Sequence, residues 1–259
     1  MYAVEVENLQ FGYYKEKIID NISFKIDEGK FVSLIGPNGS GKSTILKLLN
    51  HLYYPWEGRI LIDNQDINSF KKKELARKVS FVPQNTLIDF DFTVEDIVLM
   101  GRYPYKKRFE KYNEKDYEVV YEALKSTNTF GIKDKYITEI SGGERQRVII
   151  AKALAQETPI ILLDEPTSHL DLNHQIEILN LLKKLNREKK TTIIIAIHDI
   201  NLALRYSDEI IIINSGKIID NGKPEKVITE ENIEKVYNIK VAIEKNKFTN
   251  SLSITPISN

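Results

Sequence analysis

One short run constrains the fold of this chain more than any other segment, because residues 36–43 match the pattern G-x-x-x-x-G-K-[ST]. An apolar strand is predicted just before the run, at residues 31–35, and a helix just after it, at residues 42–49. A strand, a glycine-rich turn and a helix in this order predict an α/β fold. The run and the residue that follows it are Gly36, Pro37, Asn38, Gly39, Ser40, Gly41, Lys42, Ser43 and Thr44.

The residues of this loop suit phosphate. Glycines let the backbone curl so that its N–H groups point at phosphate oxygens, and the following helix adds the partial positive charge of its N-terminus. Lys42 would reach the terminal phosphates of a nucleotide, and the Ser43 hydroxyl would bind Mg²⁺. A chance glycine turn is the alternative, and the predicted strand and helix on either side argue against it.

Two carboxylates follow another apolar strand, predicted at residues 160–163. Asp164 and Glu165 come directly after it, at the edge where open α/β sheets place their ligands. Asp164 is predicted to bind Mg²⁺, because hard cations prefer oxygen ligands. Glu165 is then predicted to orient and deprotonate an attacking water. Without a phosphate loop elsewhere, the same residues would be an ordinary polar turn before Pro166.

A third motif, Ser141, Gly142, Gly143 and Glu144, opens a helical run over residues 144–155. A serine at the N-cap and a glutamate three residues later form a capping box, which by itself requires no function. The two glycines, however, leave bare N–H groups at the positive end of a helix, which predicts a second phosphate-binding end. The two ends need not hold the same nucleotide within one subunit.

The remaining apolar pattern predicts a core of strands and helices with one helical insert. The fold class is α/β, a P-loop NTPase core with an N-terminal antiparallel β region and an inserted helical subdomain. The core is predicted at residues 1–84 and 156–228, the helical subdomain at 85–155, and a tail with a helix and a small sheet at 229–259. Further strands are predicted at 3–6, 22–26, 60–62, 79–82, 192–197 and 210–213, and helices at 94–100, 114–126, 172–184 and 200–205.

Composition excludes several classes of function. Among 259 residues, 37 basic and 37 acidic side chains balance, so there is no electrostatic reason to expect nucleic acid as a partner. The absence of cysteine excludes disulfides and thiolate metal sites. No signal peptide is visible and the apolar runs are too short to span a bilayer. We therefore expect a cytoplasmic protein, with any membrane-spanning helices supplied by another chain.

Together these motifs resemble those of the ATP-binding-cassette ATPases, over nearly the whole chain. The phosphate loop resembles the Walker A motif, residues 141–144 the signature motif, and Asp164 with Glu165 the Walker B aspartate and the catalytic glutamate. Two departures are Ile140 and Glu144, where the family most often has leucine and glutamine, and the second leaves the role of Glu144 open. The resemblance implies ATP and Mg²⁺ as cofactors.

Four further residues carry this resemblance. Gln84 is similar to the Q-loop glutamine, which senses Mg²⁺ and the transmembrane partner, and His198 to the switch histidine, which contacts the γ-phosphate. Asp171, in the run 168–171, resembles the D-loop aspartate, and Tyr13 the aromatic that stacks on adenine. Taken singly, Gln84 would be an ordinary loop residue, His198 a structural histidine and Tyr13 a core residue.

The resemblance also implies partners. They are a second copy of the chain in a head-to-tail dimer with two ATP molecules between the subunits, the transmembrane permease subunits and, indirectly, a substrate-binding protein. The chain would then be peripheral on the inner face of the cell membrane. An ATPase of DNA maintenance would need a long heptad insert, which is absent here, and translation factors usually carry two cassettes.

A closer similarity concerns the runs 83–84, 92–96 and 101–105. They resemble the ATPase subunits of importers for iron-siderophores, haem and cobalamin. Another importer or an exporter remains the alternative, since the same runs also fit an ordinary helical subdomain. In that interpretation Thr93 is an N-cap, Gly101 a helix C′ residue and Pro104 a residue just beyond the helix end.

Overall fold

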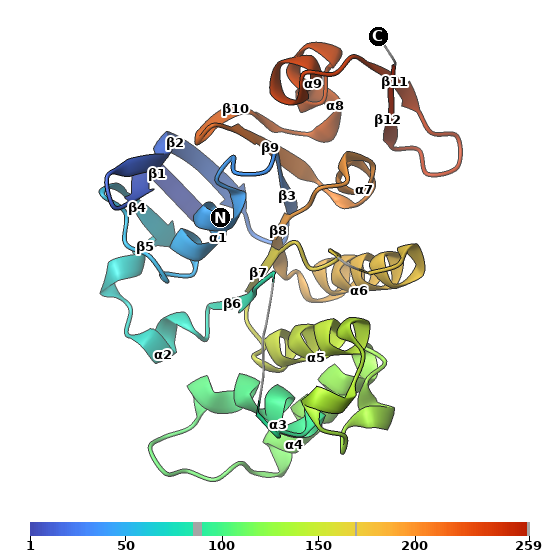
Figure 1. The fold of residues 1–259 in the computed structure, drawn as a ribbon. Coiled ribbons are helices and arrows are strands. Elements are labelled where there is room, and N and C mark those ends of the chain that lie inside the picture. The colour runs from blue at the N-terminus through green and yellow to red at the C-terminus, as the bar shows by residue number, and fades with distance from the viewer. Residues whose placement is uncertain (85–89, 169, 258–259) are drawn as a thin grey trace.

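The computed structural model describes residues 1–84, 90–168 and 170–257. Figure 1 shows the sheets gathered in one half of the molecule and the helices α3, α4 and α5 at the opposite end. Residues 85–89, at the start of the predicted helical subdomain, and His169 lie outside the described residues.

A six-stranded sheet forms the centre of the molecule, in the order β10-β9-β3-β8-β7-β6. The strands β9, β3, β8, β7 and β6 are parallel to one another. At one edge, β10 pairs antiparallel with β9. This arrangement confirms the predicted α/β class. Its strands are β3 (Phe31–Ile35), β6 (Val79–Val82), β7 (Ile160–Asp164), β8 (Thr192–Ala196), β9 (Glu209–Asn214) and β10 (Lys217–Gly222).

The N-terminal β region is antiparallel, as predicted, with the order β2-β1-β4-β5. Its first two strands have 12 residues each, far longer than predicted, because their polar residues alternate with apolar ones and interrupt the apolar runs. A separate C-terminal pair forms the small terminal sheet. The strands are β1 (Tyr2–Tyr13), β2 (Glu16–Asp27), β4 (Glu57–Ile62), β5 (Gln65–Asp66), β11 (Val241–Lys245) and β12 (Leu252–Pro256).

The helices of the insert pack against one another beside the central sheet (Figure 1). The insert was predicted as helical and is so, whereas the boundaries at residues 85, 156 and 229 stay predictions. The insert holds α3 (Val94–Leu99), α4 (Glu114–Ser126) and α5 (Gly142–Ala155), and elsewhere lie α1 (Lys42–Leu49), α2 (Lys72–Leu75), α6 (Leu172–Lys189), α7 (Ile200–Tyr206), α8 (Pro224–Val227) and α9 (Glu230–Tyr237). Four 3₁₀ turns lie at Ile67–Ser69, Met100–Tyr105, Phe130–Ile132 and Ile137–Glu139. Across the described ranges, no helix is both long and apolar enough to cross a bilayer.

Both faces of the central sheet are covered, which explains why β3, β7 and β8 are buried at every position. Phe31 and Ile35 of β3 face one core, shared with the helical insert and α6 and α7. Val32 and Leu34, at the alternate positions, face a second core shared with the antiparallel sheet and α1. Alternate side chains of a strand point to opposite faces, so two cores hold the phosphate loop in place from both sides.

The C-terminal end of α5 is fixed by a buried charge cluster. Arg102 donates to the Ala155 carbonyl at 2.7 Å and to Asp116 at 3.3 Å. Lys106 Nζ donates to the same aspartate at 2.6 Å. Arg102, Lys106 and Asp116 are all 4–6 % exposed, so this cluster anchors α5 at the end opposite Ser141.

Gly101 lies at the predicted C′ position, directly after the C-cap Met100 of α3, but it does not have the positive φ that is usual for a C′ glycine. α3 passes directly into the 3₁₀ turn Met100–Tyr105, which contains both Gly101 and Pro104. Gly101 is instead required by close packing, because a Cβ there would lie 2.4 Å from the Lys152 carbonyl oxygen. The prediction for Thr93 is confirmed, since its hydroxyl accepts from the Asp96 N–H.

Candidate nucleotide-binding site

The order of the strands brings the predicted site residues to one edge of the sheet. Leu34 of β3 and Asp164 of β7 both pair with Ala196 of the strand between them. Because these strands are parallel and in register, the segments that follow them begin at the same level. The phosphate loop, Glu165 and His198 therefore meet, and Gln84 joins them from the end of the neighbouring strand β6.

The phosphate loop is closed by its own lysine. Lys42 Nζ donates to the carbonyls of Gly36 at 2.8 Å and Pro37 at 2.9 Å. Burial lowers the pKa of Lys42, whereas the nearby carboxylates Glu165 and Asp164 raise it. Gly36 has φ +151° and a Cβ there would lie 2.0 Å from the Ile213 carbonyl oxygen, so only glycine fits.

One polar atom of the loop is left over for a ligand. The Ser40 hydroxyl is buried and has no hydrogen-bond partner among the described residues. Gly39 has open space on its Cβ side. A buried hydroxyl without a partner is costly, so this arrangement fits a loop whose polar groups are completed by phosphate.

The residues for a cation lie directly beside the loop. Ser43 Oγ donates to Asp164 Oδ1 at 2.7 Å. Burial raises the pKa of Asp164, and the Ser43 hydrogen bond lowers it. No group of three or more acidic or histidine side chains able to hold a metal occurs within the described part of the chain. A hydroxyl and a carboxylate suit Mg²⁺, which takes few protein ligands and completes its shell with water and substrate phosphates.

Glu165 lies between two other predicted residues. Gln84 Nε2 donates to one of its carboxylate oxygens at 2.5 Å, and His198 Nε2 lies 2.6 Å from the other. Its backbone has φ +49°, an uncommon conformation for a residue with a side chain. Hydrogen bonds hold this conformation, from Glu165 N to Ala196 O and from Ser168 N and Oγ to Glu165 O.

These residues line a cleft of about 420 Å³. Tyr13 borders the cleft, with its hydroxyl 3.4 Å from Thr44 Oγ1. Its ring also makes edge contacts with Phe11 and Tyr53, at centroid distances of 5.2 and 5.5 Å. Tyr13 is thus both part of an aromatic cluster and available to the cleft, so the two alternatives for it are compatible. Ile18 also lines the cleft, and no sequence signal distinguishes it from other apolar residues.

The signature residues do not join this cleft. Ser141 Oγ accepts from Glu144 N at 3.3 Å, and the Glu144 carboxylate accepts from Ser141 N at 2.9 Å. The predicted capping box is therefore confirmed. A Cβ on Gly142 would have nothing within 4 Å. The N-terminus of α5 is thus capped, open and separate from the phosphate loop of its own chain.

Asp171 also lies outside the cleft. It caps α6, because its Oδ1 accepts from His174 N at 2.9 Å, and its Oδ2 lies 2.8 Å from His174 Nδ1. The pairing with His174 was not predicted, although the three-residue spacing at a helix start is a signal for it.

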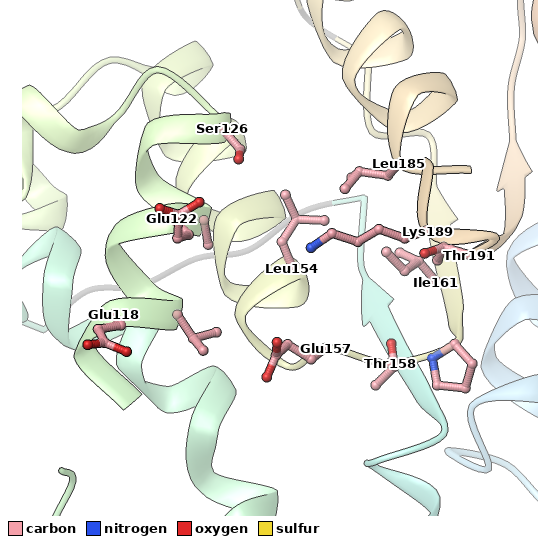
Figure 2. A pocket seen from close by; sticks show the side chains of 13 residues that line it. Glu118, Glu122, Ser126, Leu154, Glu157, Thr158, Ile161, Leu185, Lys189 and Thr191 are labelled. Atoms are coloured by element: carbon pink, nitrogen blue, oxygen red, sulfur yellow. The ribbon is translucent and has the colours of Figure 1, made fainter. Parts of the chain in front are cut away.

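A larger cavity, of about 640 Å³, lies between α4, α5 and the end of α6. Figure 2 shows Lys189 reaching toward Leu154, with Glu118, Glu122 and Glu157 around the opposite side. None of the predicted site residues lines this cavity, so the nucleotide chemistry belongs to the smaller cleft.

Comparisons with known proteins agree with this geometry. The family model described as ABC transporter matches residues 19–168. The ferric enterobactin transport ATP-binding protein FepC of Escherichia coli strain K12 is 39 % identical over 251 residues, covering 97 % of this chain and 93 % of that protein.

Two solved structures are similar over most of the chain. The first, an inward-facing conformation of a metal-chelate type ABC transporter, has a TM-score of 0.86 and 31 % identity over 99 % of this chain and 98 % of that one. The second, a dimeric post-hydrolysis state of the cassette MJ0796 bound to ADP and phosphate, has a TM-score of 0.75 and 35 % identity over 85 % of this chain and 98 % of that one. The chain belongs to the ABC transporter family and is one of its ATP-hydrolysing ATP-binding cassettes.

Proposed function

We propose that this ATPase drives a membrane importer for metal chelates of the iron-siderophore, haem or cobalamin type. The observation that carries the catalytic part is the position of Glu165, held between Gln84 and His198 beside Lys42 and Ser43. The cargo class is supported by similarity to a ferric enterobactin transport protein and to a metal-chelate type transporter.

Each residue at the cleft has a proposed task in ATP hydrolysis. Lys42 and the N–H groups of the phosphate loop hold the β- and γ-phosphates. Glu165 accepts a proton from the attacking water, and His198 holds the γ-phosphate and the carboxylate in position. Tyr13 stacks on the adenine ring. Mg²⁺, held by Ser43 and Asp164 with Gln84 nearby, would neutralise charge on the phosphates when bound.

We further propose that two copies of the chain work head-to-tail. The open N-terminus of α5, from Ser141 to Gly143, would then hold the γ-phosphate bound to the phosphate loop of the partner, with Asp171 at the same interface. The dimeric MJ0796 structure supports this arrangement by similarity. Transmembrane permease subunits would hold the pair at the inner face of the membrane, and a substrate-binding protein would deliver the chelate to them.

The catalytic role is tested by Glu165→Gln. The amide keeps the shape of the side chain but cannot accept the proton, so hydrolysis should fall by roughly 10²- to 10⁴-fold. ATP binding should persist, and the variant should accumulate as an ATP-bound dimer in size-exclusion chromatography. Glu118→Gln, on the exposed face of α4, is the matched control. Hydrolysis near the wild-type rate in Glu165→Gln would contradict the assignment.

The cargo is tested in the membrane. The chain should co-purify with a polytopic membrane protein, and that complex in proteoliposomes should hydrolyse ATP faster when a loaded substrate-binding protein is added. Ferric siderophores, haem and cobalamin are compared with an amino acid and a sugar as controls. Stimulation by the controls alone would exclude the proposed cargo class, and purification with ribosomes or DNA would exclude transport.

A further inference from the structure

The C-terminal segment, residues 229–257, packs against the part of the molecule that carries His198. It contains α9, β11 and β12, and Figure 1 shows β12 beside α7. Apolar side chains of the segment enter the main core together with Leu202 and Ala203 of α7. These side chains are Ile233, Val236, Val241 and Ile254.

One side chain joins the segment to α7 by a pair of hydrogen bonds. Asn201 Oδ1 accepts from Ile254 N at 2.8 Å, and Asn201 Nδ2 donates to Ile254 O at 3.2 Å. The side-chain amide thus takes the place of a strand neighbour along the outer edge of β12. α7 begins at Ile200 behind the N-cap Asp199, so Asn201 lies only three residues after His198.

We propose that the C-terminal segment positions the loop that carries His198, with Asn201 as the positioning residue. Asn201 fixes the first turn of α7 and through it the imidazole that lies 2.6 Å from Glu165. This inference rests on the proposed role of His198 in hydrolysis.

The pair of hydrogen bonds predicts an effect on kcat and not on ATP binding. Displacement of a catalytic group by about 1 Å can cost on the order of 10²-fold in rate, and loss of the Asn201 pair should move His198 by less. Asn201→Ala should therefore lower kcat by about tenfold and leave ATP affinity unchanged.

The experiment measures kcat and KM for ATP hydrolysis by the full chain, ATP affinity by calorimetry, and the thermal unfolding midpoint. Asn201→Asp keeps the acceptor for Ile254 N–H and loses the donor, so its kcat should lie between those of Asn201→Ala and the wild type. Phe248→Ala is the control, because Phe248 is 97 % exposed in the turn between β11 and β12. This control should match the wild type in every measurement.

Two results would overturn the inference. In the first, Asn201→Ala hydrolyses ATP like Phe248→Ala. In the second, its kcat falls only in proportion to the loss of folded protein, which is the result for a contact that is merely structural. His198→Ala in parallel separates the two proposals. An active His198→Ala contradicts the proposed role of His198 itself, whereas an inactive one beside a fully active Asn201→Ala rejects only the positioning role.

Discussion

The two predicted phosphate-binding ends of this chain, the phosphate loop and the start of α5, differ in how the protein itself satisfies their polar groups. In the phosphate loop, Lys42 is 4 % exposed and bonded to two carbonyls of the loop, and Ser43 is bonded to Asp164. At the start of α5, Ser141 and Gly142 are exposed, and the reciprocal bonds of Ser141 and Glu144 cap the helix end. The phosphate loop forms a cleft within the subunit, whereas the start of α5 is ordered but open. In the proposed dimer, each chain would bind nucleotide at its own phosphate loop and need the partner subunit to enclose it.

Among the variants that compare these two ends, the largest effect is expected from Ser141→Asp at the start of α5. Aspartate is as good an N-cap as serine, but it loses the hydroxyl bond to the Glu144 carboxylate and repels it, so the unfolding midpoint should fall slightly. Its charge, however, would face the phosphate of a partner subunit. Hydrolysis should fall by roughly 10²- to 10³-fold, as when one phosphate or oxyanion donor is lost, while ATP affinity of the isolated subunit stays normal.

Ser141→Thr is the matched control for this prediction, because it keeps both the cap and the hydroxyl. Loss of ATP affinity by monomeric Ser141→Asp, measured by calorimetry, would mean that both ends serve one nucleotide in the same chain. The contrast between the two ends would then be wrong.

Lys42→Ala tests the phosphate loop. The charge-assisted bonds of an ammonium to phosphate contribute about 1.5–3 kcal/mol, so ATP should bind about 10- to 150-fold more weakly. In contrast to Ser141→Asp, Lys42→Ala should already bind ATP more weakly as a monomer. Lys47→Ala, on the same helix, is the control. Unchanged affinity in Lys42→Ala would remove the phosphate loop from nucleotide binding.

Gly101→Ala tests whether the packing of Gly101 against the C-terminal part of α5 keeps the start of that helix in place. The new Cβ would lie 2.4 Å from the Lys152 carbonyl oxygen, so α5 must shift or strain. Overpacking of this kind costs roughly 1–3 kcal/mol, measurable by denaturant unfolding, and hydrolysis should fall more than ATP binding. Gly131→Ala, with nothing within 4 Å of its Cβ, should change neither.

Glu144→Gln should give the smallest effect, and it tests the charge of the Glu144 carboxylate alone. Glutamine also completes a capping box, so only the attraction between the carboxylate and the helix end is lost, roughly 0.3–1 kcal/mol at pH 7. Hydrogen bonds from the Ser141 hydroxyl and N–H lower the pKa of Glu144. The carboxylate therefore stabilises the fold above its unfolded pKa, and this contribution is lost as pH falls through the lower folded value.

The unfolding free energies of wild type and Glu144→Gln should accordingly differ at pH 7 and converge below about pH 4. A difference that stays constant from pH 7 to pH 3 would show that the charge of Glu144 plays no part.

Much of the site could be predicted because its signals are local. β3, the glycine loop and α1 follow one another without a gap, and the predicted bounds 31–35 and 42–49 agree with the structure. The N-cap at Thr93 and the capping box at Ser141 were equally readable. Gln84 and His198 carry no local signal, and only the family resemblance singled them out.

The parts of the fold and the site that could not be predicted depend on contacts between residues far apart in the sequence. Gln84 and Glu165 are separated by 81 positions, and no periodicity reports that they touch. Gly101 lies at the predicted C′ position, but the reason for a glycine there is close packing against the carbonyl of Lys152, which is far away in the sequence. β10 was missed because its half-buried pattern is weak, and only its pairing with β9 makes it a strand.

Because Arg102 holds the C-terminal end of α5, this helix can pivot about that end. Its 14 residues span roughly 21 Å at about 1.5 Å per residue. If the end at Ala155 stays fixed, a tilt of about 10° moves Ser141 by roughly 4 Å, more than the length of a hydrogen bond. A rotation of the helical insert too small to disturb its packing would thus suffice to admit or release a phosphate at the far end, while the phosphate loop of the same chain keeps its shape.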